Sequence, residues 1–146
     1  MRIVVDTNIV FSAVLNTDSH ISRIFLYSKS KLNFYSTLQL LTELEENKGK
    51  LIKISKYTEP QLLRVTELIT QRIRFINPAL IPKSIYNKAE SLTADVDIDD
   101  TEFIALSEHM KAKFWSGDKA LIKGLKQKGW NRFIETQELF KLVAKK

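Results

Sequence analysis

Five acidic residues stand where carboxylates could do chemistry: Asp6, Glu43, Asp99, Asp100 and Asp118. Asp6 interrupts an apolar β-branched run, and Asp118 closely follows another apolar run. Carboxylates gathered in one pocket repel one another unless protons or cations lie between them. Oxygen ligands without histidine or cysteine suit Mg²⁺ or Mn²⁺. Because such ions orient water and bind phosphate oxygens, clustered acids here would predict phosphoryl-transfer chemistry.

Each of these acids taken alone also has a simpler interpretation. Asp6 and Asp118 could each cap the helix that follows. Asp99 and Asp100 could do the same and favour the helix dipole. Glu43 could lie on a solvated helix face with the two glutamates that follow it closely. The elements that position the acids therefore decide between ligands and caps.

Short apolar strands alternate with amphipathic helices along the chain. The predicted strands are 3–5, 31–35, 75–76, 113–116 and 133–134. The predicted helices are 8–15, 18–30, 37–47, 58–73, 83–93, 103–110, 119–128 and 136–145. Asn8 is a candidate cap of the first helix, the spacing of Ser36 and Gln39 predicts a capping box, and Gly49 predicts the end of that helix. The alternation predicts an α/β fold with a mainly parallel five-stranded sheet and right-handed crossovers.

A parallel sheet would bring the acids to one edge. All strand C-termini lie at that edge, and ligands bind where the strand order reverses. Asp6 ends the first predicted strand and Asp118 follows the fourth. Asp99 and Asp100 precede the helix that leads into the fourth strand, and Glu43 lies in the helix after the second. If the first and fourth strands are neighbours, the acids converge.

Composition places the chain among globular proteins. It has 146 residues, 44% of them hydrophobic, which predicts one domain over residues 1–146. There is no cysteine and no apolar run long enough for a membrane span, so we expect a cytoplasmic protein. The net charge of +6 favours polyanionic partners. With only four glycines and no glycine-rich phosphate loop, dinucleotide or P-loop binding is disfavoured.

Three stretches of the sequence resemble the PIN domain family. MRIVVDTNIVFSAV resembles the family's first motif, a strand followed by Asp-Thr-Asn and a helix. TLQLLTELEE resembles the helix with the family's acidic residue, which maps to Glu43. DIDDTEFIALSEHMKAKFWSGDKAL resembles the last two acidic motifs, with Asp100 before the helix and Asp118 in Ser-Gly-Asp. The resemblance covers essentially the whole chain and implies a three-layer α/β/α PIN-like fold.

The resemblance implies a Mg²⁺- or Mn²⁺-dependent endoribonuclease. It would be a VapC-like toxin of a toxin–antitoxin pair, with RNA as substrate, an antitoxin protein as partner and a homodimeric state. Its catalytic acids would be Asp6, Glu43, Asp100 and Asp118. Asp99 is an alternative metal ligand, and Asp97 could support the set. Hydrogen bonds that support the acids are expected from Thr7, Asn8 and Ser116.

A lysine series follows the last acid. Lys119, Lys123 and Lys126 would share one face of the helix 119–128, where they either contact the RNA backbone or form a solvated face. Two alternative functions stay open. The first is an RNA-binding PIN domain without catalysis. The second, less favoured, is an aspartate-based phosphatase, which needs a second aspartate at position 8, where this chain has Asn8.

Overall fold

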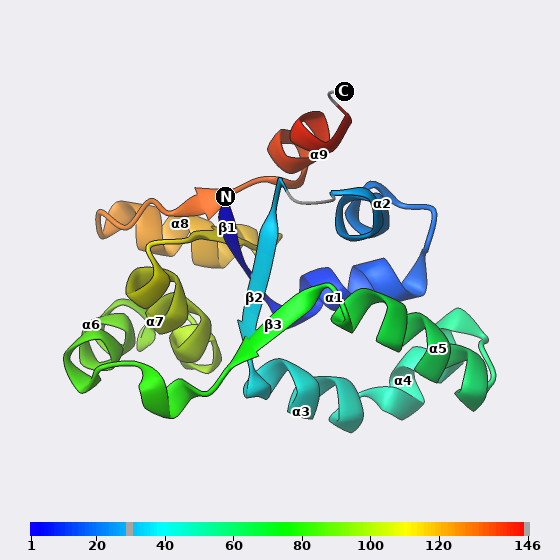
Figure 1. The fold of residues 1–146 in the computed structure, drawn as a ribbon. Coiled ribbons are helices and arrows are strands. Elements are labelled where there is room, and N and C mark those ends of the chain that lie inside the picture. The colour runs from blue at the N-terminus through cyan, green and yellow to red at the C-terminus, as the bar shows by residue number, and fades with distance from the viewer. Residues whose placement is uncertain (29–30, 145–146) are drawn as a thin grey trace.

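The structure is a computed structural model and describes residues 1–28 and 31–144. Within them a five-stranded sheet runs through the centre, in the order β3-β2-β1-β4-β5 (Figure 1). Every neighbouring pair is parallel. The strands are β1 Arg2–Val5, β2 Asn33–Thr37, β3 Ile73–Ile76, β4 Lys113–Trp115 and β5 Phe133–Ile134. The predicted α/β fold with a parallel central sheet is confirmed.

Helices cover both faces of this sheet. Figure 1 shows α6, α7 and α8 on one side and α1, α2 and α5 on the other, which gives the expected three layers. The α-helices are α1 Thr7–Leu15, α2 His20–Tyr27, α3 Leu38–Glu46, α4 Lys48–Ser55, α5 Glu59–Thr70, α6 Lys83–Thr93, α7 Thr101–Met110, α8 Lys119–Gln127 and α9 Thr136–Ala144. Two 3₁₀ turns, η1 Pro78–Leu80 and η2 Ile98–Asp100, precede α6 and α7.

The strand order reverses beside β1. The chain passes from β1 to β2 and on to β3, then returns through α6 and α7 to β4 on the other side of β1. Val5, the last residue of β1, stands opposite Trp115, the last residue of β4. The segments that follow these two strands therefore begin side by side, at the kind of sheet edge where parallel α/β folds bind ligands.

Buried aromatic side chains pack together in the core next to the strands that lead to this edge of the sheet. Trp115 is fully buried, and its ring lies 5.1 Å from that of Phe25, which lies 4.8 Å from that of Phe34. The indole Nε1 of Trp115 donates a hydrogen bond of 2.9 Å to the Thr136 hydroxyl, so the one polar atom of the ring has a partner. Large aromatic side chains dominate core energetics, and this cluster joins β4 to β2 and α2.

The second strand and the helix after it differ from the prediction. The strand covers 33–37 instead of 31–35, and Ser36 lies inside it, where its hydroxyl donates to the Val5 carbonyl at 2.9 Å. Ser36 therefore caps no helix. Thr37 is the N-cap of α3, without a side-chain cap hydrogen bond. Gly49 does not end this helix but lies within α4, an element that the sequence reading missed.

The other boundaries follow the sequence more closely. Thr58 and Gln61 form a complete capping box at the start of α5, whereas Ile73 begins β3 instead of ending the helix. The helices predicted over 18–30 and 136–145 are α2 and α9 of the structure. Residues 29–30 and 145 of those predictions lie outside the described residues. Within residues 1–28 and 31–144, none of the helices is both long enough and apolar enough to cross a membrane.

Candidate metal centre

Asp6 lies directly after β1 and is nearly fully buried, with 4% of its surface exposed. Its Oδ1 accepts a hydrogen bond of 2.9 Å from the Ile9 amide, so Asp6 is the N-cap of α1. The candidate cap Asn8 instead lies in the first turn of that helix and is exposed. The cap takes up only one lone pair of this carboxylate, so Asp6 keeps lone pairs that could bind a cation.

Asp118 follows β4 and is the N-cap of α8. Its Oδ1 accepts from the Leu121 amide at 3.1 Å. The hydroxyl of Ser116 accepts from the Asp118 amide at 3.1 Å, and Ser116 also hydrogen-bonds the Asp6 carboxylate. One serine at the end of β4 thus connects the two acids that follow the neighbouring strands. Both acids cap helices, and the capping role does not remove them from the site.

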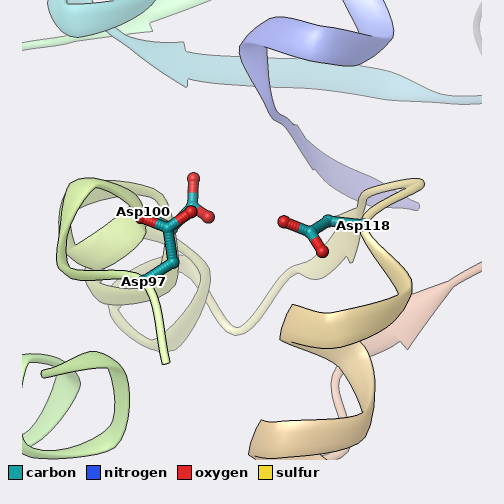
Figure 2. Close-up of side chains that lie close together, drawn as sticks. All are labelled: Asp97, Asp100 and Asp118. Atoms are coloured by element: carbon teal, nitrogen blue, oxygen red, sulfur yellow. The ribbon is translucent and has the colours of Figure 1, made fainter. Parts of the chain in front are cut away.

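Three carboxylates meet at this edge of the sheet. Asp97, Asp100 and Asp118 each offer one oxygen, and these oxygens all lie within 4.8 Å of one another. Figure 2 shows Asp118 pointing from the start of α8 toward Asp97 and Asp100, which come from the segment before α7. This grouping is the one of its kind in the described part of the chain. Oxygens at such spacing repel one another and attract a cation.

Asp97 belongs to this group, whereas Asp99, the predicted additional ligand, lines the same cavity without belonging to the group. The Asp99 side chain is exposed, and its carbonyl accepts a hydrogen bond of 2.8 Å from the Gln39 side chain. Asp97 is half-buried, and its Oδ1 accepts from the Asp99 amide at 3.1 Å within η2. The signal for Asp97 was its place three residues before Asp100 in an acidic run.

Glu43 reaches the same cavity from α3. The cavity has a volume of about 160 Å³ and is lined by Asp6, Thr7, Asn8, Glu43, Asp97, Asp99, Asp100, Phe103 and Asp118. One turn earlier in α3, Nε2 of Gln39 donates a hydrogen bond of 2.8 Å to Glu43 Oε1 and so orients this carboxylate. Glu45 lies on another face of the helix, beside an apolar groove between α3, α4 and α5. Of the two, Glu43 lies with the other acids.

Burial and like charges raise the pKa of two of these acids. Asp6 has its pKa raised from 3.8 to about 6, first by burial and then by the charges of Asp118 and Glu43, against hydrogen bonds from Ser116 and the Ile9 amide. For Asp100, burial and the charges of Asp97, Asp6 and Asp118 raise the pKa from 3.8 to about 8. Without a cation, this cluster therefore holds protons near neutral pH that isolated aspartates would release.

Thr7, one of the residues that line the cavity, carries a buried polar atom without a protein partner. The Thr7 hydroxyl is buried and makes no hydrogen bond to any residue that the structure describes. The hydrogen bond expected from Thr7 to the acids is therefore not formed. A buried oxygen without a partner is costly. The carboxylate-rich lining of the cavity and the raised pKa values together fit a hard divalent cation.

The three predicted lysines share one face of α8. Lys119, Lys123 and Lys126 line an open groove of about 620 Å³, together with Ile122, Gln127 and Glu135. Lys119, at one end of this set, follows Asp118 directly in the sequence.

Comparison with known proteins identifies the family. The family model of the PIN domain matches residues 4–139, which is most of the chain. The chain belongs to the PIN domain family. Its acids after β1, in α3, before α7 and after β4 are those that the sequence motifs indicated.

A solved structure has a similar fold. It is the VapBC2 complex from Rickettsia felis, described as bound to a DNA fragment from its promoter. Our protein superposes on one chain of that structure with a TM-score of 0.65 and 16% sequence identity. The match covers 92% of our protein and 97% of the solved chain. At that identity the likeness concerns the fold. A search among curated proteins gave no match.

Proposed function

We propose that this PIN domain is a metal-dependent endoribonuclease that hydrolyses RNA phosphodiester bonds. The observation that carries the proposal is the group of Asp97, Asp100 and Asp118, whose oxygens lie within 4.8 Å of one another at the switch point of a parallel sheet. Caps alone do not account for this grouping, because Asp100 makes no side-chain cap hydrogen bond. Two alternatives, a non-catalytic RNA-binding domain and an aspartate-based phosphatase, make different predictions below.

Asp6, Glu43, Asp97, Asp100 and Asp118 would hold Mg²⁺ or Mn²⁺. When bound, such an ion neutralises phosphate charge and lowers the pKa of water, which supports in-line hydrolysis. Asp99 contributes through its carbonyl, which holds Gln39 and thereby Glu43.

The remaining side chains orient these acids and the substrate. Ser116 fixes the Asp6 carboxylate, and the Ile9 amide holds its Oδ1. Lys119, Lys123 and Lys126 would bind phosphates of the strand on one side of the scissile bond, so the RNA would enter along α8. Asn8 lines the cavity and is exposed, so it would hydrogen-bond a substrate oxygen or a water.

The biological setting is also part of the proposal. The structurally similar chain belongs to a complex described as VapBC2, and we propose that this protein is likewise the toxin of a toxin–antitoxin pair in the cytoplasm. An antitoxin protein would be its partner, and two copies would form a homodimer. Exposed leucines on α5, Leu63 and Leu68, leave apolar surface for protein contacts.

The test is cleavage of end-labelled single-stranded RNA by the purified protein with Mg²⁺ or Mn²⁺. The controls are an EDTA lane and the Asp118→Asn variant, which keeps the size of the side chain and removes the charge. Cleavage that requires both the metal and Asp118 would support the proposal. Binding of RNA without cleavage would favour the non-catalytic domain, and a covalent phospho-aspartate would favour the phosphatase.

A further inference from the structure

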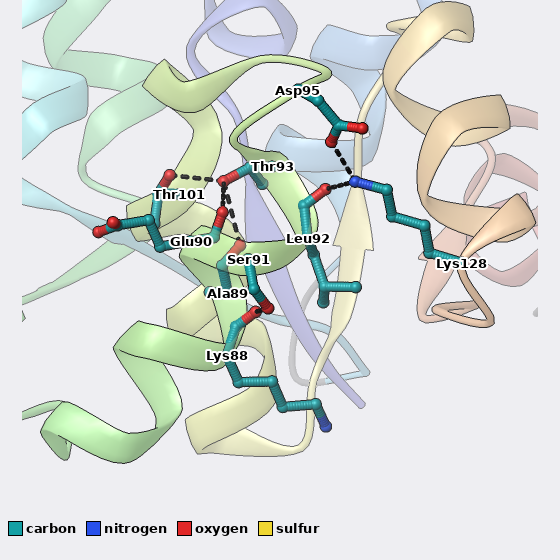
Figure 3. Close-up of polar contacts among 9 residues, drawn as sticks. All are labelled: Lys88, Ala89, Glu90, Ser91, Leu92, Thr93, Asp95, Thr101 and Lys128. Atoms are coloured by element: carbon teal, nitrogen blue, oxygen red, sulfur yellow. Dashed lines mark hydrogen bonds and ion pairs between the residues drawn. The ribbon is translucent and has the colours of Figure 1, made fainter.

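The segment 94–100 supplies Asp97 and Asp100, and α8 begins at Asp118. These two parts of the chain are far apart in sequence and must keep a fixed separation for the three carboxylates to act together. Polar contacts hold the two ends of the segment (Figure 3), and a close packing contact holds its middle. The contacts come from α6, from α7 and from α8.

A buried hydroxyl pair closes the two ends of the segment. Thr93, the last residue of α6, and Thr101, the first of α7, have their Oγ1 atoms 2.7 Å apart. Thr93 Oγ1 also lies 3.0 Å from the Ala89 carbonyl, and Thr101 Oγ1 lies 2.6 Å from the Ile98 carbonyl. Each hydroxyl has one proton, so one threonine donates to the other, and the accepting threonine donates its own proton to a carbonyl. In either direction the pair ties the last turn of α6 to the start of α7.

Lys128, at the end of α8, holds the start of the segment. Its Nζ donates a hydrogen bond of 2.8 Å to the Leu92 carbonyl, in the last turn of α6, and forms an ion pair with Asp95 (Figure 3). The Leu92 bond satisfies a carbonyl that the helix end leaves open. Helix α8 therefore has Asp118 at its N-terminal end, and Lys128 at its C-terminal end contacts the segment 94–100.

Between these two points, Gly124 allows α8 to lie against Val96. A Cβ placed on Gly124 would stand 2.9 Å from Val96 Cγ2 and 3.0 Å from Cγ1, closer than carbon atoms pack. Gly124 lies inside a regular helix, where alanine is favoured over glycine, and its backbone needs no positive φ. Its presence in the helix is therefore explained by this close packing.

We propose that α8 is a brace that sets the separation between Asp118 and the carboxylates of Asp97 and Asp100. In α8 the positioning residues are Gly124 and Lys128, which contact the segment 94–100. The hydroxyls of Thr93 and Thr101 join the two ends of this segment. The inference rests on the proposed metal centre. Val96 is one residue from Asp97, so a displacement of Val96 by an added methyl group would shift Asp97 and change its separation from Asp118.

The test measures Mn²⁺ affinity by isothermal titration calorimetry, without RNA, for Gly124→Ala and for a matched control. Gly49→Ala is that control, because Gly49 also lies within a helix and a Cβ there would meet nothing within 4 Å. We expect Gly124→Ala to weaken Mn²⁺ binding by about 10-fold or more, the scale seen when groups behind a metal site are altered. Gly49→Ala should bind Mn²⁺ as the wild type does.

A second variant separates a displaced segment from a general loss of structure. Val96→Ala removes both methyl groups that the new Cβ would meet, so Val96→Ala/Gly124→Ala should regain the Mn²⁺ affinity of Val96→Ala alone. The brace is refuted if Gly124→Ala binds Mn²⁺ as tightly as the wild type, or if the double variant stays as weak as Gly124→Ala. A wild-type protein that binds no Mn²⁺ would refute the proposed function, and this inference with it.

Discussion

Replacing Asp100 with asparagine should stabilise the protein in the absence of metal. Burial and the charges of Asp97, Asp6 and Asp118 raise the pKa of Asp100 from 3.8 to about 8. Between these two pH values the folded protein keeps a proton that the unfolded chain has released. The free energy of unfolding of the wild type therefore falls as the pH rises from about 4 to about 8. Asparagine carries no charge and removes this loss.

The size of the effect follows from the displacement of the pKa. Moving a pKa from 3.8 to about 8 corresponds to roughly 6 kcal/mol at ~1.4 kcal/mol per pH unit. Because the side chain is only half-buried and water screens its neighbours, we expect about 2 kcal/mol. The gain of Asp100→Asn over the wild type should thus be small near pH 4, grow through pH 6 and level off above pH 8.

The assay is urea unfolding in EDTA, followed by circular dichroism from pH 4 to pH 9. Asp99→Asn is the matched control: it removes the same charge one residue earlier, from an exposed side chain, and should show a much smaller pH-dependent gain. Adding Mn²⁺ should reverse the order, since a ligand at 100 times its Kd stabilises a protein by ~2.7 kcal/mol and the variant lacks one carboxylate. A pH-independent difference between Asp100→Asn and wild type would refute the raised pKa of Asp100.

Three further predictions concern other parts of the molecule. Lys123→Ala should weaken RNA binding at all sequences and reduce the slope of log affinity against log salt by about 1, whereas Lys53→Ala on α4 should not; equal slopes would contradict a phosphate contact. Thr58→Ala should lower the free energy of unfolding by ~1 kcal/mol, because it removes the capping box of α5; an unchanged urea midpoint would mean that water replaces the cap. Sedimentation equilibrium should give twice the chain mass of 16.9 kDa for the proposed homodimer, and a mass of one chain would contradict it.

The sequence alone determined which residues lie at the edge of the sheet. Apolar β-branched runs and helical periodicity are local signals, so the order of strands and helices could be predicted from them. The location of Asp6 and Asp118 at the sheet edge could be predicted directly from this order, since each comes after a strand of one parallel sheet. The acidic motifs added the family and, through it, Glu43 and Asp100. The predicted helix start near Ser36 and the predicted helix end at Gly49 were wrong, because strand pairing and packing overrode the local capping signals.

The tertiary structure decided which acids share the cavity and what holds them there. Residues two apart on a helix point to different faces, and the contacts of α3 place Glu43, not Glu45, with the other acids. The turn η2 directs Asp97 inward and leaves the Asp99 side chain exposed, which no spacing in an acidic run could show. Gly124 against Val96, and Lys128 on α6, join segments distant in sequence. Such contacts depend on how helices pack, and packing is set by the whole fold.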